Sequence, residues 1–345
     1  MMQTRRTQLA TLTAALLAAS FGAQATSDVD FYGSIRMGLD YVDAGSDNDA
    51  INGRDFLSRI GVKGSTDITD GIKGIAVVEY GLRGEDSINF KQNDKPTFRQ
   101  LFVGLDTDYG KVTFGSQTVL YYTYVGSGYF SDAFDSLRLT GVRADDMLQY
   151  EYGAGNFKIA SQVQLSGQDG DDVDQFQLAG QYGVGPLKLQ AALVADTKGD
   201  DKGNKYGVRG WYDVTDSITL SAFFDFAEGD FAGAIQPGNL KTTDNDGESI
   251  SGVTQCELED RQTSGIYGAY SFGASKVHAR YALSSCDNSG DVSSYKAEYT
   301  YKLNKQMNLW ASYEILDADN SRKVTKDDVT YDDFSQLQLG VRYDF

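Results

Sequence analysis

Apolar and polar residues alternate with a period of two in one segment after another between residues 29 and 345. In segment 157–165 one face carries the apolar residues Phe157, Ile159, Val163 and Leu165. The opposite face of the same segment is polar, with Lys158, Gln162 and Gln164. Segments 187–195, 295–303 and 337–345 repeat the pattern. Because side chains of a β-strand point to opposite faces in turn, this period predicts strands with one apolar and one polar face.

The connections between these segments alternate between short turns and long polar loops. Seven short turns lie at 67–71, 108–110, 153–156, 185–186, 215–217, 273–274 and 304–306. Eight long loops lie at 44–52, 86–96, 118–142, 167–172, 197–202, 231–260, 287–292 and 319–332. Short turns on one side, long loops on the other and an even strand count are typical of outer-membrane barrels. The pattern therefore predicts an all-β fold, a 16-stranded antiparallel transmembrane β-barrel.

A soluble β-sandwich or β-propeller is the alternative fold. Either would have to bury an apolar face on every strand, and a propeller would show a repeat of about 40 residues, which this chain lacks. Hydrophobic residues make up 41% of the chain and the mean hydropathy is −0.39, which argues against membrane-spanning helices. Since lipid offers no water to an open sheet edge, a membrane chain of low hydropathy must close its sheet into a barrel.

The first 25 residues do not follow the alternating pattern. Arg5 and Arg6 precede an apolar run at 9–21, and Ala23-Gln24-Ala25 has the form of a cleavage site. This arrangement predicts a secretory signal peptide over 1–25, followed by a single barrel domain over 26–345. The alternative is a true first helix. Export would place the mature chain in an oxidising compartment.

Composition narrows the function. The net charge of −18 argues against a nucleic-acid binder, which needs a basic face. Glycine occurs 38 times but proline only 3 times, as suits β-ladders joined by tight turns. The single histidine, His278, lies between Lys276 and Arg280 on a polar strand face, and we interpret it as a water-exposed lumen side chain. With one histidine and no nucleophile-elbow motif, we expect no enzyme activity, no cofactor and no metal.

Four motifs, in their order and spacing, resemble the Gram-negative general porins. They are Val29-Asp30-Phe31-Tyr32-Gly33, residues 58–64, residues 99–105 and the run 109–117. The resemblance covers the whole chain after residue 25. It implies a trimeric, sixteen-stranded diffusion channel in the outer membrane, surrounded by lipid and lipopolysaccharide. The C-terminal Phe345, after an alternating strand, resembles the signal by which such barrels are handed to the barrel assembly machinery.

The resemblance also implies that the third long loop, 118–142, folds into the barrel as a constriction loop. Its candidate acidic residues are Asp132 and Asp135. In this family such acids face arginines on the barrel wall, and a field across a narrow wet slit orients dipolar solutes. The alternation along its strand also places Glu79 on the face that points into the barrel, and we interpret it as a solvated charge.

By motif match, Arg59 and Arg99 occupy positions at which this family carries arginines on the barrel wall. Arg143 is a looser match, and Arg36 lies one pleat beyond a position that is often basic in relatives. The alternation places Arg36 and Arg59 on polar faces, but Arg99 shares its face with apolar residues such as Leu101. For each of these charges the alternative is a solvated lumen side chain with no role in selectivity.

The two cysteines form a candidate disulfide, Cys256–Cys286. Pairing segments 261–272 and 275–286 as a hairpin puts Cys286 level with Arg261, at the end that carries the long loops. Cys256 lies five residues before Arg261, within reach of the same mouth. The alternative is two free thiols.

Together these features predict an outer-membrane porin for passive diffusion of small hydrophilic solutes and ions. Because many acids lie in the outer loops, we expect a modest cation preference at low salt. The alternatives are a solute-specific channel, a surface adhesin or phage-receptor barrel with a plugged lumen, and a barrel hydrolase.

Overall fold

The computed structural model describes most of the chain after the predicted signal peptide. The described residues are 27–43, 49–82, 98–126, 129–130, 139–165, 172–196, 203–229, 241–243, 249–251, 260–287, 290–318, 324–326, 329–331 and 333–345. The predicted signal peptide, 1–25, lies outside them. Within these ranges no helix is long and apolar enough to cross a bilayer.

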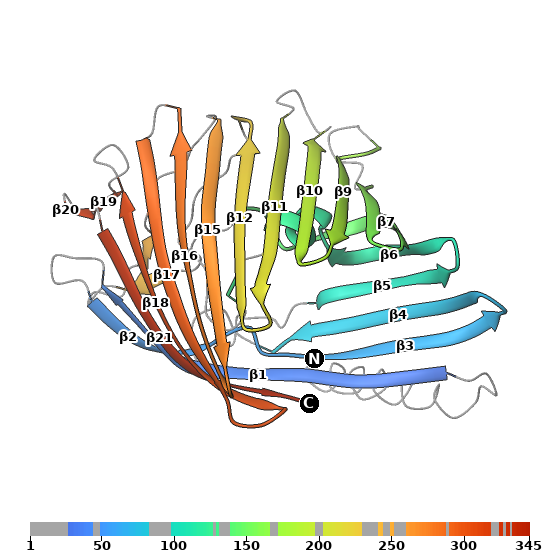
Figure 1. Ribbon diagram of the computed structural model, residues 1–345, viewed down its shortest axis with the longest axis horizontal. Helices are drawn as coiled ribbons and strands as arrows, with labels where there is room; N and C mark the ends of the chain where they lie inside the picture. Colours follow the sequence, from blue (N-terminus) through green and yellow to red (C-terminus); the bar gives the residue numbers. More distant parts are fainter. Residues whose placement is uncertain are drawn as a thin grey trace, which may run out of the picture.

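One large antiparallel sheet dominates the molecule (Figure 1). Its first strands are β1 (Ser27–Asp43), β2 (Asp49–Asp55), β3 (Arg59–Thr69), β4 (Ile72–Gly81), β5 (Phe98–Thr107) and β6 (Gly110–Thr118). It continues with β7 (Arg143–Ala154), β8 (Phe157–Gln164), β9 (Gln175–Val184), β10 (Leu187–Asp196), β11 (Asn204–Thr215) and β12 (Ile218–Ala227). It ends with β15 (Arg261–Phe272), β16 (Ser275–Cys286), β17 (Gly290–Lys302), β18 (Met307–Ala318) and β21 (Asp333–Asp344).

Three smaller elements complete the described structure. The pairs β13 (Lys241–Thr243) with β14 (Ser249–Ser251), and β19 (Val324–Lys326) with β20 (Val329–Tyr331), form two separate short hairpins. A single π-helical turn, η1 (Tyr122–Gly126), follows β6.

The sheet is a closed barrel of sixteen strands, as predicted. Each strand pairs with its neighbour in sequence, and the last strand, β21, pairs with β1 to close the ring. The sheet has seventeen segments, but β2 and β3 are two halves of one strand, since both pair with β1. The strand is interrupted at Phe56–Ser58, where Leu57 has a φ of 72° and the Phe56 N–H donates to the Arg36 carbonyl.

The outer face of the barrel is apolar and the inner face is polar, as a barrel in lipid requires. On β17, Tyr295 and Tyr299 are more than 40% exposed on the outside, whereas Lys296 and Glu298 point inward and are 3% and 2% exposed. Large apolar side chains are likewise exposed on the outer faces of β1, β3, β5–β12, β15–β18 and β21. An apolar band outside and polar residues inside is the reverse of a soluble β-protein and matches a barrel surrounded by hydrocarbon.

Candidate functional site

The third long loop enters the barrel directly after β6. The Leu120 N–H donates to Gln162 Oε1 at 3.1 Å, and the Tyr121 N–H donates to Gln177 Oε1 at 2.9 Å. Both glutamines lie on the inner faces of β8 and β9 and are buried. The first residues of the loop therefore run along the inner wall.

A recess in the wall receives this part of the loop. Four loop residues, Leu120, Tyr121, Tyr124 and Val125, pack against Ala160, Ala179, Ala192 and Val194 of β8–β10. On β11 the wall residue is Gly207, and a Cβ there would lie 2.6 Å from Val125 Cγ1 and would also overlap the Tyr121 hydroxyl. Small inner residues on four neighbouring strands thus leave the space that η1 fills.

Farther along the loop, Tyr129 packs on the wall formed by β11, β12 and β15. Its ring stacks on Tyr267 at a centroid distance of 4.2 Å and an interplanar angle of 9°. The Arg209 guanidinium lies 4.7 Å from the ring centroid, and the Tyr129 hydroxyl is 3.0 Å from Ser221 Oγ. A stacked ring, a cation and a hydroxyl therefore hold this residue against the wall.

The next residue, Phe130, covers a charged part of the wall on β16 and β17. Its ring is stacked at 4.8 Å on His278, and the charged groups of Arg280 and Lys296 lie 5.6 and 5.1 Å from its centroid. His278 is 3% exposed, with Nδ1 3.0 Å from the Tyr267 hydroxyl and Nε2 3.0 Å from Glu298 Oε1. The interpretation of His278 as a water-exposed side chain is therefore wrong. Phe130 covers its ring, and Phe130 comes from a loop whose path the strand pattern does not reveal.

Three predicted arginines gather on the part of the wall formed by β3–β7. Arg99 Nε lies 2.6 Å from Glu79 Oε1, and Arg59 Nε lies 3.6 Å from Glu79 Oε2. Arg143, the first residue of β7, interacts electrostatically with Arg99, Arg59 and Glu79. We call Arg59, Arg99, Arg143 and Glu79 the arginine cluster. It holds three cations and one carboxylate, and the side chains of Arg59 and Arg99 stay 23% and 12% exposed.

A β-bulge explains how Arg99 joins this cluster despite the phase of its neighbours. Glu79 pairs with Gln100 and Tyr80 pairs with Phe98, so Arg99 is the extra residue of β5. An extra residue shifts the alternation by one, and Arg99 faces Glu79 while Leu101 and Val103 point outward. Glu79, interpreted from sequence as a solvated charge, is buried and also accepts a hydrogen bond from the Tyr32 hydroxyl at 3.2 Å.

Arg36 has a different set of contacts from the arginine cluster. Its side-chain Nε donates to Ser34 Oγ at 2.9 Å, its backbone N–H donates to Ser58 Oγ at 2.9 Å, and it interacts electrostatically with Asp344. The predicted loop acids, Asp132 and Asp135, lie outside the described residues. Their place opposite the arginines stays a prediction.

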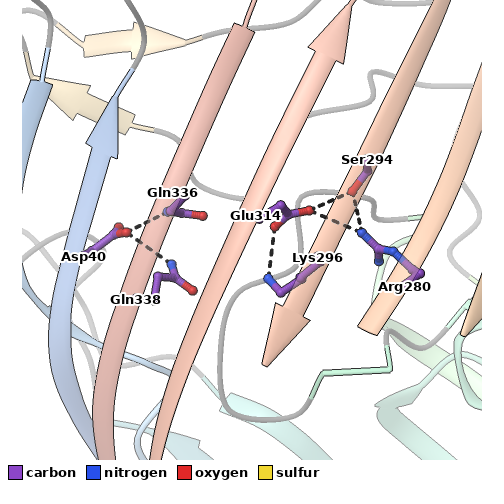
Figure 2. Close-up of polar contacts among 7 residues, drawn as sticks. All are labelled: Asp40, Arg280, Ser294, Lys296, Glu314, Gln336 and Gln338. Atoms are coloured by element: carbon purple, nitrogen blue, oxygen red, sulfur yellow. Dashed lines mark hydrogen bonds and ion pairs between the residues drawn. The ribbon is translucent and has the colours of Figure 1, made fainter. Parts of the chain in front are cut away.

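A second group of inward-facing charges is paired within the wall itself. Figure 2 shows Glu314 of β18 contacting Lys296 Nζ at 3.0 Å, Ser294 Oγ at 3.0 Å and Arg280 Nη2 at 3.2 Å. Beside it, Asp40 Oδ1 accepts hydrogen bonds from the amides of Gln336 and Gln338 (Figure 2). We call these seven residues the paired wall. All of them are buried.

The hairpin that carries Cys286 has the predicted register, with Cys286 opposite Arg261. Cys286 is buried and disulfide-bonded. Cys256 lies outside the described residues, so its pairing with Cys286 stays a prediction.

Comparison with known proteins agrees with the barrel fold. A family model of Gram-negative porins matches residues 11–345. The chain belongs to the Gram-negative porin family. It is 26% identical to an outer membrane porin protein of Bordetella pertussis, over 87% of this chain and 92% of that protein. The chain is accordingly an outer-membrane porin, as the sequence motifs predict.

Two solved structures show how widely the fold is shared. An anion-selective porin from Comamonas acidovorans superposes with a TM-score of 0.68 at 16% identity, covering 93% of this chain and 100% of that one. The trimer form of OmpT, an outer membrane protein of Vibrio cholerae, gives a TM-score of 0.65 at 19% identity, with 92% and 99% coverage. At such identities the likeness concerns the barrel alone.

Proposed function

We propose that this porin forms a water-filled channel for passive diffusion of small hydrophilic solutes and ions, narrowed by the loop 118–142 beside the arginine cluster. The observation that carries the proposal is the docking of the loop on the walls of β8–β12 and β15–β17 by Leu120, Tyr121, Tyr129 and Phe130. The arginines of β3–β7 meanwhile keep part of their surface free for water and solutes. Such an arrangement leaves an off-centre passage with fixed charge along one side.

Two measurements on reconstituted protein test the channel and its constriction. Liposome swelling with sugars of graded size should show a sharp size cutoff without saturation. Saturation would instead favour a solute-specific channel, and absence of swelling would favour a plugged adhesin or receptor barrel. Deleting residues 124–134 should raise the single-channel conductance, because it removes Tyr129 and Phe130 together with the part of the loop that they hold against the wall. An unchanged conductance in an intact barrel would contradict the constriction.

The proposed ion preference is modest and cationic at low salt. Many carboxylates lie in the outer loops, whereas the arginine cluster holds three cations against one carboxylate. At ~0.15 M salt the Debye length is about 8 Å, so the two regions act separately. Reversal potentials across a salt gradient should show cation preference that fades as salt rises. Asp132→Asn combined with Asp135→Asn should move the channel toward anions, and anion preference of the wild type at low salt would overturn the proposal.

The same proposal includes the assembly of the protein. We expect a homotrimer embedded in outer-membrane lipid and lipopolysaccharide, exported by the signal peptide 1–25 and inserted by the barrel assembly machinery through Phe345. The trimer form of the Vibrio cholerae neighbour supports the oligomeric state, and the exposed apolar band supports the lipid contacts. Cross-linking in native membranes should yield trimers, and a monomer at all concentrations would contradict this part.

Two further parts of the proposal concern chemistry. We expect no enzyme activity, in keeping with the porin family, and a hydrolase assay on the purified barrel that showed turnover would contradict this. We also expect Cys286 to pair with Cys256, tying the loop 231–260 to the end of β16. The denatured, unreduced protein should then show no free thiol, whereas labelling of both cysteines would exclude the bridge.

A further inference from the structure

One buried carboxylate lies between the two ends of the loop 118–142. Asp225, on the inner face of β12, is 0% exposed. At the start of the loop the Tyr121 hydroxyl donates to Asp225 Oδ2. At the end of the loop the Leu139 carbonyl accepts a hydrogen bond at 3.4 Å from Arg261 Nη2, which also lies 3.3 Å from Asp225 Oδ1. Asp225 thus contacts one end of the loop directly and the other through Arg261.

Two cations depend on this carboxylate. Lys205 Nζ of β11 lies 3.9 Å from Asp225 Oδ2 and 4.8 Å from the centroid of the Tyr121 ring. Lys205 and Arg261 each have side chains that are 2% exposed. Buried cations need a nearby counter-charge, and Asp225 is the acid that both contact among the described residues. Removing its charge would therefore disturb both sides of the contact with the loop.

The hydroxyl of Tyr121 is a dependable donor at this site. Burial, followed by the negative charge and hydrogen bond of Asp225, raises the pKa of the Tyr121 hydroxyl far above its usual range. The hydroxyl is therefore protonated, and able to donate to Asp225, at neutral pH.

We propose that Asp225 is the positioning residue of the constriction, holding both ends of the loop against β11, β12 and β15 and thereby setting the width of the passage. The inference rests on the proposed function, in which this loop narrows the channel. Asp225 need not touch a passing solute, because it acts through Tyr121, Arg261 and Leu139. A charge on the wall then controls the size of the solutes that cross.

Single-channel conductance and the swelling cutoff of reconstituted barrels test the proposal. Asp225→Asn should raise both toward the values of the variant lacking residues 124–134. Tyr121→Phe should raise both by a smaller amount, because it removes one hydroxyl and leaves the ion pairs in place. Asp40→Asn is the matched control, since Asp40 is equally buried and pairs with Arg54 but its described contacts do not include the loop. Its conductance should equal that of the wild type.

A combined variant separates positioning from general destabilisation. In the barrel lacking residues 124–134, Asp225→Asn should leave the conductance unchanged, because the segment that narrows the passage is absent although Tyr121 and Leu139 remain. An equal increase with and without the loop would show that the substitution loosens the barrel itself and would overturn the proposal. Should Asp225→Asn fail to assemble, Tyr121→Phe decides alone, and wild-type conductance in that variant would overturn the proposal.

The failure of this inference can be told apart from failure of the proposed function. If the loop deletion widens the channel but Asp225→Asn and Tyr121→Phe do not, the constriction stands and Asp225 is not its positioning residue. If the loop deletion leaves the conductance unchanged, the constriction itself is contradicted.

Discussion

The arginine cluster and the paired wall lie on the same inner face of the barrel but differ in how far their charges are exposed. In the cluster, Arg59, Arg99 and Arg143 surround one carboxylate and stay partly exposed. In the paired wall, the carboxylate of Glu314 contacts both Lys296 and Arg280, and all three are buried. Charged groups that stay partly exposed to water can act on a passing ion, whereas buried charges that contact one another hold neighbouring strands together.

Removing the carboxylate of the paired wall tests its structural role most directly. Glu314→Gln takes away the negative group that Lys296 and Arg280 share and should lower the free energy of unfolding by about 3 kcal/mol. Glu151→Gln is the control, since its pair with Lys111 at 3.4 Å is partly exposed and should contribute less than about 1 kcal/mol. Urea unfolding in lipid vesicles measures both. Equal stability of the two variants would contradict a structural role for the paired wall.

A second test changes the wall that the loop contacts without changing any charge. Gly207→Val should displace η1, because even a Cβ at this position overlaps Tyr121 and Val125, and the conductance should rise. Gly183→Val is the matched control, because a Cβ at Gly183 meets no atom within 4 Å. If Gly207→Val keeps the wild-type conductance in a folded barrel, the recess does not hold the loop.

Single substitutions in the arginine cluster should change ion selectivity only modestly. Arg59→Gln should shift the reversal potential toward cations, and Glu79→Gln should shift it toward anions, because each changes the balance of the same wet cluster. Lys296→Gln, in the paired wall, should shift it less than Arg59→Gln. Equal shifts for Lys296→Gln and Arg59→Gln would show that burial does not separate the two groups of charges.

Local sequence patterns predicted the architecture well. Strand positions and short turns depend on neighbouring residues, so alternation and turn composition were enough to give sixteen strands and their closure. The face of Arg59 follows from the same alternation. The face of Arg99 does not, since the bulge in β5 inserts one residue, and the alternation of the sequence does not reveal that insertion.

The environment of the candidate site was harder to predict because it is made by distant segments. Glu79 is buried by Tyr32, Arg59 and Arg99, which come from three other strands. His278 is covered by Phe130, which lies in a loop far away in the sequence. The contact between Tyr121 and Asp225 joins residues 104 positions apart. A one-dimensional pattern identifies which residues face inward but does not reveal what covers them.

The alanine-lined recess also sets an order of events during folding. The loop residues Leu120–Val125 emerge early in the chain, but the surface that receives them consists of β8–β11, which come later. The recess exists only once those strands have paired, so the loop docks after β8–β11 have formed. A newly inserted barrel should therefore pass through a wide-bore stage. Vesicles sampled during refolding should leak larger sugars early than late, and a constant size cutoff throughout would contradict this order.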